Sequence, residues 1–180
     1  MKIGIAGIGG IGSNVARHLA QARVESVKIV DHDLVEPSNL NRQFYRMSQV
    51  GRKKTDSLVE NLKEIFPGMI IEKMDMTLGP GDTGQVFSDC DIVVEGFDNK
   101  TLKKMIIEEL SATGKILISA SGIAGTDMTG VIIKKMGNCH IVGDLMSDSE
   151  SVELFGPKII LAAALMAGIV LTHIKEKENE

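Results

Sequence analysis

Three glycines near the start of the chain have the spacing of a phosphate-binding turn. Gly7, Gly9 and Gly12 follow the pattern G-x-G-x-x-G directly after a short apolar run at residues 2–6. In such a turn the glycines allow a tight bend, a close approach of backbone to phosphate oxygens, and close packing of a helix on a strand. The helix that we expect at residues 11–23 would point its free N–H groups at the bound anion.

An acidic residue at a suitable distance from these glycines strengthens the interpretation. Asp31 ends a second apolar run at residues 27–30, about twenty residues beyond the glycine pattern. A carboxylate in this position can accept hydrogen bonds from both hydroxyls of a ribose. The sequence therefore predicts a nucleotide site, and the alternative is a glycine turn that serves helix packing only.

Alternating strands and helices would position such a site. The polar stretch at 32–51 has no clear period, and a connection of that length is typical of a functional loop. A Gly/Pro turn is expected at 78–82. The alternation predicts an α/β protein with a doubly wound (Rossmann-like), mostly parallel sheet and ligands at the carboxyl ends of its strands. We expect strands at 2–6, 27–30, 69–74, 91–95 and 115–120, and helices at 11–23, 54–66 and 99–112.

The pattern changes in the last third of the chain. Two short strands, at 131–136 and 140–142, are expected to form a hairpin around a Gly137-Asn138 turn. An apolar helix at 159–174 and a charged tail at 175–180 follow. No linker rich in Pro, Gly or Ser divides the chain. We therefore predict a single domain at 1–180, with a nucleotide-binding part at 1–125, a crossover and hairpin region at 126–157, and a helix and tail at 158–180.

The composition limits the classes of function that remain. The chain has 180 residues, 43% hydrophobic residues, 24% charged residues and a formal net charge of -4. This length suits one domain with its own core, and it is too short for a dehydrogenase with a separate substrate domain. The sequence has no basic block or aromatic ladder, which argues against nucleic acid as the main partner.

Three features bear on compartment and membrane association. The chain enters a strand without a charged leader, which predicts a cytoplasmic protein. Cys90 and Cys139 are the only cysteines, so neither a disulfide framework nor a CxxC metal motif is expected. The apolar run at 159–174 is shorter than the roughly 20 residues of a membrane span and contains Thr172 and His173. We interpret it as a buried core or subunit-interface helix, with a membrane segment as the alternative.

The segment after the second strand carries a longer pattern. Residues 31–43, DHDLVEPSNLNRQ, resemble the D-x-D-x-V-x-x-S-N-L-x-R-Q signature of the ThiF/MoeB-type adenylating enzymes, which are relatives of the ubiquitin-activating enzymes. Residues 51–54, GRKK, are similar to the G-x-x-K element of that family, and residues 97–99, FDN, to its Asp-Asn element. The resemblance covers 1–125 well and 126–180 in outline.

In this family the matching positions hold ATP. Lys54 is preferred to its neighbour Lys53 because it lies three positions after Gly51, as in the G-x-x-K element. The resemblance implies nucleotide contacts by ten residues: Gly7, Gly9 and Gly12 at the phosphates, Asp31 at the ribose, Asn39, Arg42 and Lys54 at the triphosphate, Asp98 at a Mg²⁺ ion, and Asp33 and Gln43 as further contacts.

Arg42, Lys54 and Asp98 are the candidate catalytic residues that the resemblance implies. When a carboxylate attacks the α-phosphate, negative charge builds on the equatorial oxygens and on the departing pyrophosphate. A guanidinium can bind two phosphate oxygens at once, while a lysine acts as a mobile point charge. Each residue also has a structural alternative: Arg42 and Lys54 as surface charges, Asp98 as a helix N-cap, and Asn39 as a turn former.

The family's substrate is the C-terminal glycine carboxylate of a small ubiquitin-like sulfur carrier, such as ThiS in thiamine synthesis or MoaD in molybdopterin synthesis. The resemblance implies an ATP-dependent adenylyltransferase that forms the carrier's acyl-adenylate, releases pyrophosphate and works as a homodimer. The short chain, which starts at the first strand, favours the ThiS type. Two alternatives remain: a non-catalytic nucleotide-binding relative, and an NAD-dependent oxidoreductase that rests on the glycine turn alone.

The sequence departs from the family pattern in three places. Longer relatives hold a structural zinc with two CxxC pairs, and none is expected here. Cys139 is the one candidate for the crossover-loop cysteine of many relatives, but a structural role is favoured for it and for Cys90. Relatives also use an arginine from an N-terminal extension of the partner subunit to neutralise the phosphates. No such extension is expected here, so either Arg17 or Arg46 replaces that arginine or activity is slower. The four histidines lack metal-ligand spacing, which favours solvated or hydrogen-bonded roles.

Overall fold

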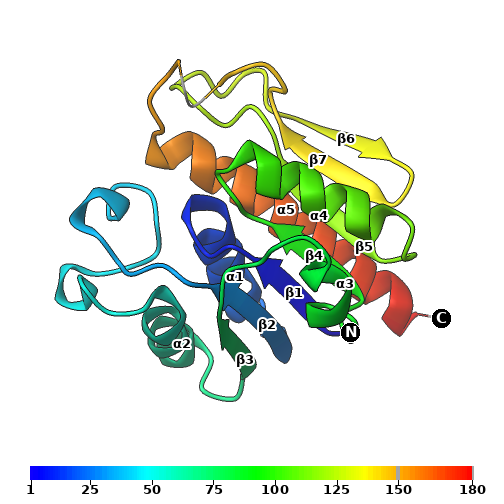
Figure 1. The fold of residues 1–180 in the computed structure, drawn as a ribbon, viewed down its shortest axis with the longest axis horizontal. Helices are drawn as coiled ribbons and strands as arrows, with labels where there is room; N and C mark the ends of the chain where they lie inside the picture. Colours follow the sequence, from blue (N-terminus) through cyan, green and yellow to red (C-terminus); the bar gives the residue numbers. More distant parts are fainter. Residues whose placement is uncertain (149–150, 180) are drawn as a thin grey trace.

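A seven-stranded sheet forms the centre of the computed structural model, which describes residues 1–148 and 151–179 (Figure 1). Its order is β3-β2-β1-β4-β5-β7-β6, and every neighbouring pair is parallel except β6 with β7. The predicted doubly wound, mostly parallel sheet with a short hairpin is confirmed. The strands are β1 (Ile3–Ala6), β2 (Ser26–Asp31), β3 (Ile70–Asp75), β4 (Ile92–Glu95), β5 (Ile116–Ala120), β6 (Ile132–Met136) and β7 (Cys139–Gly143).

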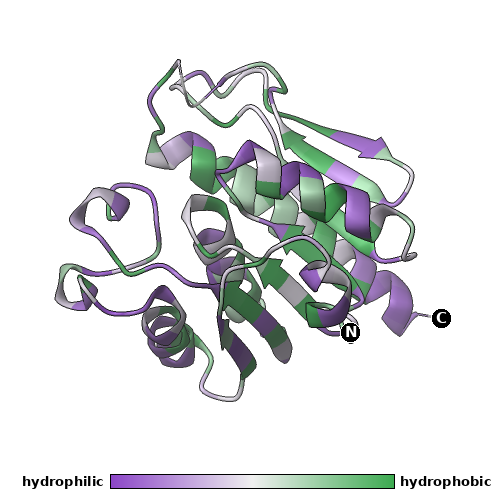
Figure 2. Cartoon of the chain, viewed as in Figure 1, coloured by the Kyte–Doolittle hydropathy of each residue, from purple (hydrophilic) through white to green (hydrophobic). Residues whose placement is uncertain are grey.

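Helices cover both faces of the sheet and create two apolar cores. The helices α1 (Gly10–Gln21), α2 (Lys54–Ile65) and α5 (Gly156–Glu178) pack on one face. The short α3 (Asp82–Val86) and α4 (Lys100–Ser111) pack on the other. Figure 2 shows apolar residues concentrated in the strands and along α5, with hydrophilic residues along α2 and α4. Because β1 and β4 are buried along their whole length, they appear in the sequence as continuous apolar runs.

The last helix is longer than the sequence predicts. It begins at Gly156 and ends at Glu178, so most of the expected charged tail is helical. Lys175 and Lys177 lie in its last turn, where positive charge is favourable to the helix dipole. By length and composition alone α5 could cross a membrane, yet its buried side chains belong to the core that it shares with α1. The expectation of a buried core helix is therefore confirmed.

Three short elements escape the periodic pattern. The 3₁₀ turns Pro37–Asn39 and Met47–Gln49 lie within the polar stretch 32–51. The helix α3 starts after the predicted Gly/Pro turn, where Gly81 takes a left-handed conformation with φ of 88°. An element of one or two turns is too short to show a helical period, which explains why the sequence did not predict it.

The strand order places a binding site between β1 and β4. The chain winds outward from β1 through β2 to β3, then crosses back to β4 and continues to β5 on the opposite side. At such a switch point the loops after the two central strands diverge and leave a crevice at their carboxyl ends. Here those loops are the glycine turn after β1 and residues 96–98 after β4.

Candidate active site

A cavity of about 290 Å³ opens at the carboxyl ends of β1 and β4. Its walls come from the glycine turn, the end of β2, the polar loop, the start of α2 and the loop after β4. Ile123, Leu154 and Ile159, from the last third of the chain, close one side with apolar surface. Eight of the ten predicted contact residues line it: Gly7, Gly9, Asp31, Asp33, Arg42, Gln43, Lys54 and Asp98.

The glycines of the turn have two roles, because some line the cavity and another allows α1 to pack closely on β1. Gly7 has φ of +81°, a conformation that favours glycine, and Gly7 and Gly9 both line the cavity. Gly12 does not line it; a Cβ atom at Gly12 would lie 1.9 Å from the carbonyl oxygen of Gly7. Gly12 thus lets the first turn of α1 approach β1. No side chain caps this helix at Gly9, so its first N–H groups remain available to an anion at the cavity.

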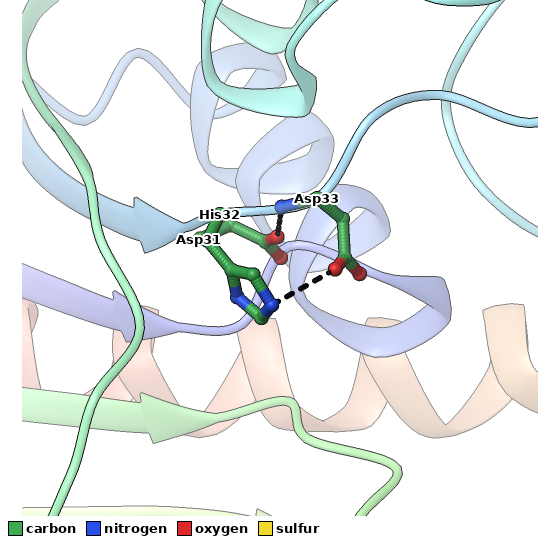
Figure 3. Close-up of side chains that lie close together, drawn as sticks. All are labelled: Asp31, His32 and Asp33. Carbon is green, nitrogen blue, oxygen red and sulfur yellow. Dashed lines mark hydrogen bonds and ion pairs between the residues drawn. The ribbon is translucent and has the colours of Figure 1, made fainter.

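Asp31 is held at the end of β2 by two backbone donors. Its Oδ2 accepts from the Ile8 nitrogen at 2.8 Å. Its Oδ1 accepts from the Asp33 nitrogen at 2.8 Å, the bond drawn in Figure 3. The first bond ties β2 directly to the glycine turn. A carboxylate offers about four acceptor sites, so the Asp31 oxygens can still accept from the hydroxyls of a ribose.

Asp31, His32 and Asp33 also form the compact group drawn in Figure 3, whose ligand atoms lie within 4.8 Å of one another. The His32 Nε2 atom is 3.3 Å from Asp33 Oδ1. However, backbone donors engage both Asp31 oxygens, and Lys54 engages Asp33. Because these internal donors already stabilise the carboxylates, the group does not require a cation to balance its negative charge.

Lys54 opens α2 and points its charge toward the cavity. The side chain is buried, and its Nζ atom lies 2.7 Å from Asp33 Oδ2. Its backbone nitrogen also donates to the Asp33 carbonyl oxygen at 2.9 Å. By contrast, Lys53 is exposed and pairs with Asp75. The structure thus excludes a surface role for Lys54 and supports the choice of Lys54 over Lys53.

Four hydrogen bonds fasten the segment 42–45 to the glycine turn, to the start of α1 and to α2. The Asn14 side chain donates to the Arg42 carbonyl oxygen at 2.9 Å, and the Phe44 nitrogen donates to Ser13 Oγ at 3.0 Å. The Asn61 side chain donates to the Phe44 carbonyl oxygen at 2.8 Å. The buried Tyr45 hydroxyl donates to the Ile8 carbonyl oxygen at 2.8 Å. Tyr45 is a positioning residue that the sequence did not reveal.

Two side chains of this segment reach the cavity with unused polar atoms. The Arg42 Nη1 atom donates to the Ser38 carbonyl oxygen and to Asn41 Oδ1, each at 2.8 Å. These bonds orient the guanidinium and, among residues 1–148 and 151–179, leave its other nitrogens for a ligand. Gln43 Oε1 is buried and has no hydrogen-bond partner within the described part of the chain. A buried acceptor of this kind calls for a donor from a ligand or from water.

Asn39 forms a turn, which is the structural alternative considered for this residue. It is buried outside the cavity lining, and its Oδ1 accepts from the Glu36 nitrogen at 3.0 Å. This bond closes the 3₁₀ turn Pro37–Asn39, which precedes Arg42. Asn39 therefore shapes the loop that presents Arg42, and its contact with the triphosphate stays a prediction.

Asp98 is an exposed carboxylate at the mouth of the cavity. It is not the N-cap of α4: that position is Asn99, whose Oδ1 accepts from the Thr101 and Leu102 nitrogens at 2.9 and 3.1 Å. Within the residues that the structure describes, no hydrogen bond or ion pair occupies the Asp98 side chain. Asp98 is thus free to bind a ligand or a cation.

The loop that carries Asp98 is organised by Glu95, a fully buried acid at the end of β4. Its Oε1 accepts from the Phe97 nitrogen at 2.7 Å, and its Oε2 accepts from Ser119 Oγ and Lys103 Nζ at 2.5 Å each. The sequence placed Glu95 in a strand without assigning it a role. An acidic residue that ends a buried apolar strand was the available signal.

Three further expectations concern residues away from the cavity. Arg17 lies over the Phe44 ring, and Arg46 pairs with Glu64; neither lines the cavity of its own chain, and their role at the phosphates stays a prediction. Cys139 is buried at the start of β7, and burial raises the pKa of its thiol. Burial also raises the pKa of Cys90 to about 11. Both thiols are therefore in environments that disfavour the reactive thiolate.

The histidines are not all separate from one another. His140 on β7 and His173 on α5 face each other, with their Nε2 atoms 3.4 Å apart. They are 33 residues apart in the sequence, so no local spacing could have indicated the pair. For His173 the expected hydrogen-bonded role is met by Glu176, whose Oε2 atom lies 3.1 Å from the His173 Nδ1 atom.

The fold and cavity are those of a doubly wound α/β protein with a G-x-G-x-x-G glycine turn at its switch point. The family model described as "ThiF family" matches residues 1–180. The chain therefore belongs to the ThiF family, as its motifs indicated.

Several known proteins resemble the chain. Adenylyltransferase and sulfurtransferase UBA4 of Candida glabrata is 34% identical over 142 residues, which are 77% of this chain and 33% of that protein. The chain spans about a third or less of the curated relatives it matches.

Two solved structures share the fold. The tRNA N6-threonylcarbamoyladenosine dehydratase TcdA of E. coli, in complex with AMP, has a TM-score of 0.90 at 19% identity and covers 99% of this chain and 88% of its own. E. coli MccB with ATP has a TM-score of 0.76 at 20% identity and covers 97% of this chain and 55% of its own.

Proposed function

We propose that the chain is an ATP-dependent adenylyltransferase that activates the C-terminal glycine carboxylate of a ubiquitin-like sulfur carrier. The observation that carries this proposal is the convergence, around one cavity, of the glycine turn, Arg42, Lys54 and Asp98 from four separate segments. The name of the Candida glabrata relative, an adenylyltransferase, supports the reaction. The AMP and ATP in the TcdA and MccB structures support the nucleotide.

The positive groups suit the charge that this reaction develops. A carboxylate oxygen of the carrier attacks the α-phosphorus, the bond from phosphorus to the bridging oxygen breaks, and pyrophosphate leaves with that electron pair. Lys54 Nζ has three donors, and its bond to Asp33 at 2.7 Å uses one of them. The remaining donors, with the free nitrogens of Arg42, are available to phosphate oxygens. Because Asp33 and Ser38 hold these side chains in place, little reorganisation is needed during the reaction.

We propose that Asp98 binds Mg²⁺ together with the phosphates of ATP. Its carboxylate fits a hard cation, because it lies at the cavity mouth without an internal partner in the described residues. Bound Mg²⁺ would neutralise charge on the phosphate oxygens.

Partner, assembly and compartment belong to the same proposal. We take a ThiS-type carrier of thiamine biosynthesis as the substrate, because residues 31–43 resemble the signature of the ThiF/MoeB-type enzymes, whose substrates include such carriers. We propose a cytoplasmic homodimer, and Ile160, which is 39% exposed on the apolar helix α5, offers surface for such an interface. Gel filtration tests the dimer: a mass near 19.4 kDa, that of one chain, would contradict it.

ATP–pyrophosphate exchange with a ThiS-type carrier ending in Gly-Gly tests the reaction. We expect exchange that requires both Mg²⁺ and the carrier, and that falls by about 10²–10³ in Asp98→Asn. Glu178→Gln is a matched control, because it removes a carboxylate at the far end of α5. ATP binding without exchange would favour a non-catalytic relative. Binding of NAD in preference to ATP would refute the proposal.

A further inference from the structure

The histidine pair between β7 and α5 lies far from the cavity. Ile159 lines the cavity near the start of α5, and His173 lies fourteen positions further along the helix, a rise of about 21 Å. On the strand side, His140 follows the first residue of β7, at the end of the sheet opposite to the cavity. The proposed adenylation does not use either side chain.

The distance between the two imidazoles is longer than that of an ordinary hydrogen bond. The two Nε2 atoms are 3.4 Å apart, and the ring centroids are 5.4 Å apart with the rings at 74°. Two imidazole nitrogens, each about 2.0–2.1 Å from a tetrahedral zinc ion, lie about 3.3 Å from each other. The observed separation therefore matches two ligands of one metal ion.

A carboxylate fixes the orientation of the second ring. His173 Nδ1 lies 3.1 Å from Glu176 Oε2, one turn further along α5. An Nδ1–H group that donates to this carboxylate leaves the lone pair of Nε2 directed at His140. A metal-bound histidine usually donates its other ring N–H group to a carboxylate, a carbonyl oxygen or water, and Glu176 is such a carboxylate.

The charges around the pair are mixed. Burial, followed by the charges of His173 and Lys135, lowers the pKa of His140. Lys135 lies opposite His140 on β6 and is exposed to solvent. Lys177, one turn beyond His173, is paired with Asp91 at 3.1 Å. Glu176 is thus the charged group that contacts the pair directly.

We propose that His140 and His173 bind a divalent transition metal ion of the Zn²⁺ type, which links β7 to the C-terminal part of α5. The His173 side chain is 18% exposed, so solvent can reach the ion and water can complete its coordination. The two imidazoles act as neutral ligands through Nε2, and Glu176 acts as a positioning residue through Nδ1 of His173.

Calorimetric titration of the EDTA-treated full chain with ZnCl₂, without nucleotide, tests the site. We expect one zinc ion per chain and a rise in the melting temperature when it binds. His173→Gln should abolish both effects, and this variant should fold because the position is partly exposed. Glu176→Gln should weaken zinc binding about 10- to 100-fold, since removal of the orienting partner typically has an effect of that size.

His32→Gln is the matched control, because His32 belongs to the other compact group of possible ligands. Zinc binding that survives His32→Gln and disappears in His173→Gln would support the proposal. Loss of binding in His32→Gln alone, or no zinc binding by the wild-type chain, would overturn it. The ¹⁵N chemical shifts of the histidine rings give a separate readout: zinc must shift Nε2 of both His140 and His173.

Discussion

Gly12→Ala tests the packing on which the whole cavity depends. Gly12 lies in the first turns of α1, where an added Cβ would be 1.9 Å from the Gly7 carbonyl oxygen and 3.0 Å from the Gly7 carbonyl carbon. Gly168 in α5 is the matched control, because it is also helical but has nothing within 4 Å of an added Cβ. The two substitutions add the same methyl group to the same kind of element.

The two variants should differ in the sign of their effect on stability. Replacing a helix-interior glycine with alanine stabilises a protein by about 0.8–1 kcal/mol through backbone entropy, and Gly168→Ala should show that gain. At Gly12 the contact is with backbone, which cannot rotate away as a side chain can. Overpacking of this kind costs about 1–3 kcal/mol or more. Gly12→Ala should therefore destabilise the chain by up to about 2 kcal/mol, or more, after the helical gain is subtracted.

Urea unfolding followed by circular dichroism measures the stability difference, and calorimetry measures ATP affinity. Moving α1 away from Gly7 also displaces the N–H groups that face the cavity, so Gly12→Ala should bind ATP more weakly. Gly168→Ala should bind ATP as the wild type does. If Gly12→Ala matched Gly168→Ala in both stability and ATP affinity, the packing role assigned to Gly12 would be refuted.

Three further substitutions test other contacts. Tyr45→Phe removes the hydroxyl that donates to the Ile8 carbonyl oxygen. We expect the free energy of unfolding, measured in urea, to fall by about 1–3 kcal/mol. An unchanged midpoint would contradict the positioning role. Lys158→Met leaves the Asp144 carboxylate without its lysine partner at 2.6 Å. The free energy of unfolding should fall by on the order of 3 kcal/mol. Adding Asp144→Asn to the same chain should restore part of that stability. Burial lowers the pKa of His18 from 6.5, so its protonation is disfavoured in the folded state. The free energy of unfolding should fall as the pH drops below about 6.5; His18→Gln should reduce this slope, and an equal slope in both proteins would be evidence against it.

The sequence predicted best the features that a local pattern encodes. The glycine turn, Asp31 and the alternating strands and helices are each defined within about thirty residues, the length of one βαβ unit. The family signature added Arg42 and Lys54, whose side chains the structure brings to the same cavity. Asn39 shows the limit of such a match, because a motif position can shape the loop instead of lining the site.

What the sequence did not predict are pairings between distant polar residues. Lys158 stands beside a long apolar run, where a lysine usually marks the exposed end of a helix, yet it is only 2% exposed. Its Nζ atom donates to the Ala124 carbonyl oxygen at 2.7 Å and pairs with Asp144. Burial of a charge is acceptable only where a partner is present, and neither spacing nor composition reveals that partner.

These distant pairings explain how the two parts of the cavity are held. Backbone packing fixes the glycine side, since Gly12 and Gly96 each place a missing Cβ against the Gly7 carbonyl oxygen. The opposite wall, which includes Ile123 and Ile159, has a close backbone contact of its own, because an added Cβ at Gly156 would lie 2.7 Å from the Asn41 carbonyl oxygen, and it also depends on a side-chain link. Lys158, near the start of α5, donates to the Ala124 carbonyl oxygen in the loop after β5 and pairs with Asp144 after β7. It thereby joins these loops to α5. Loss of that one side chain should therefore loosen the apolar wall while the glycine turn stays intact. A Lys158→Met variant should bind the substrate that contacts this wall more weakly under conditions in which its α/β core is still folded.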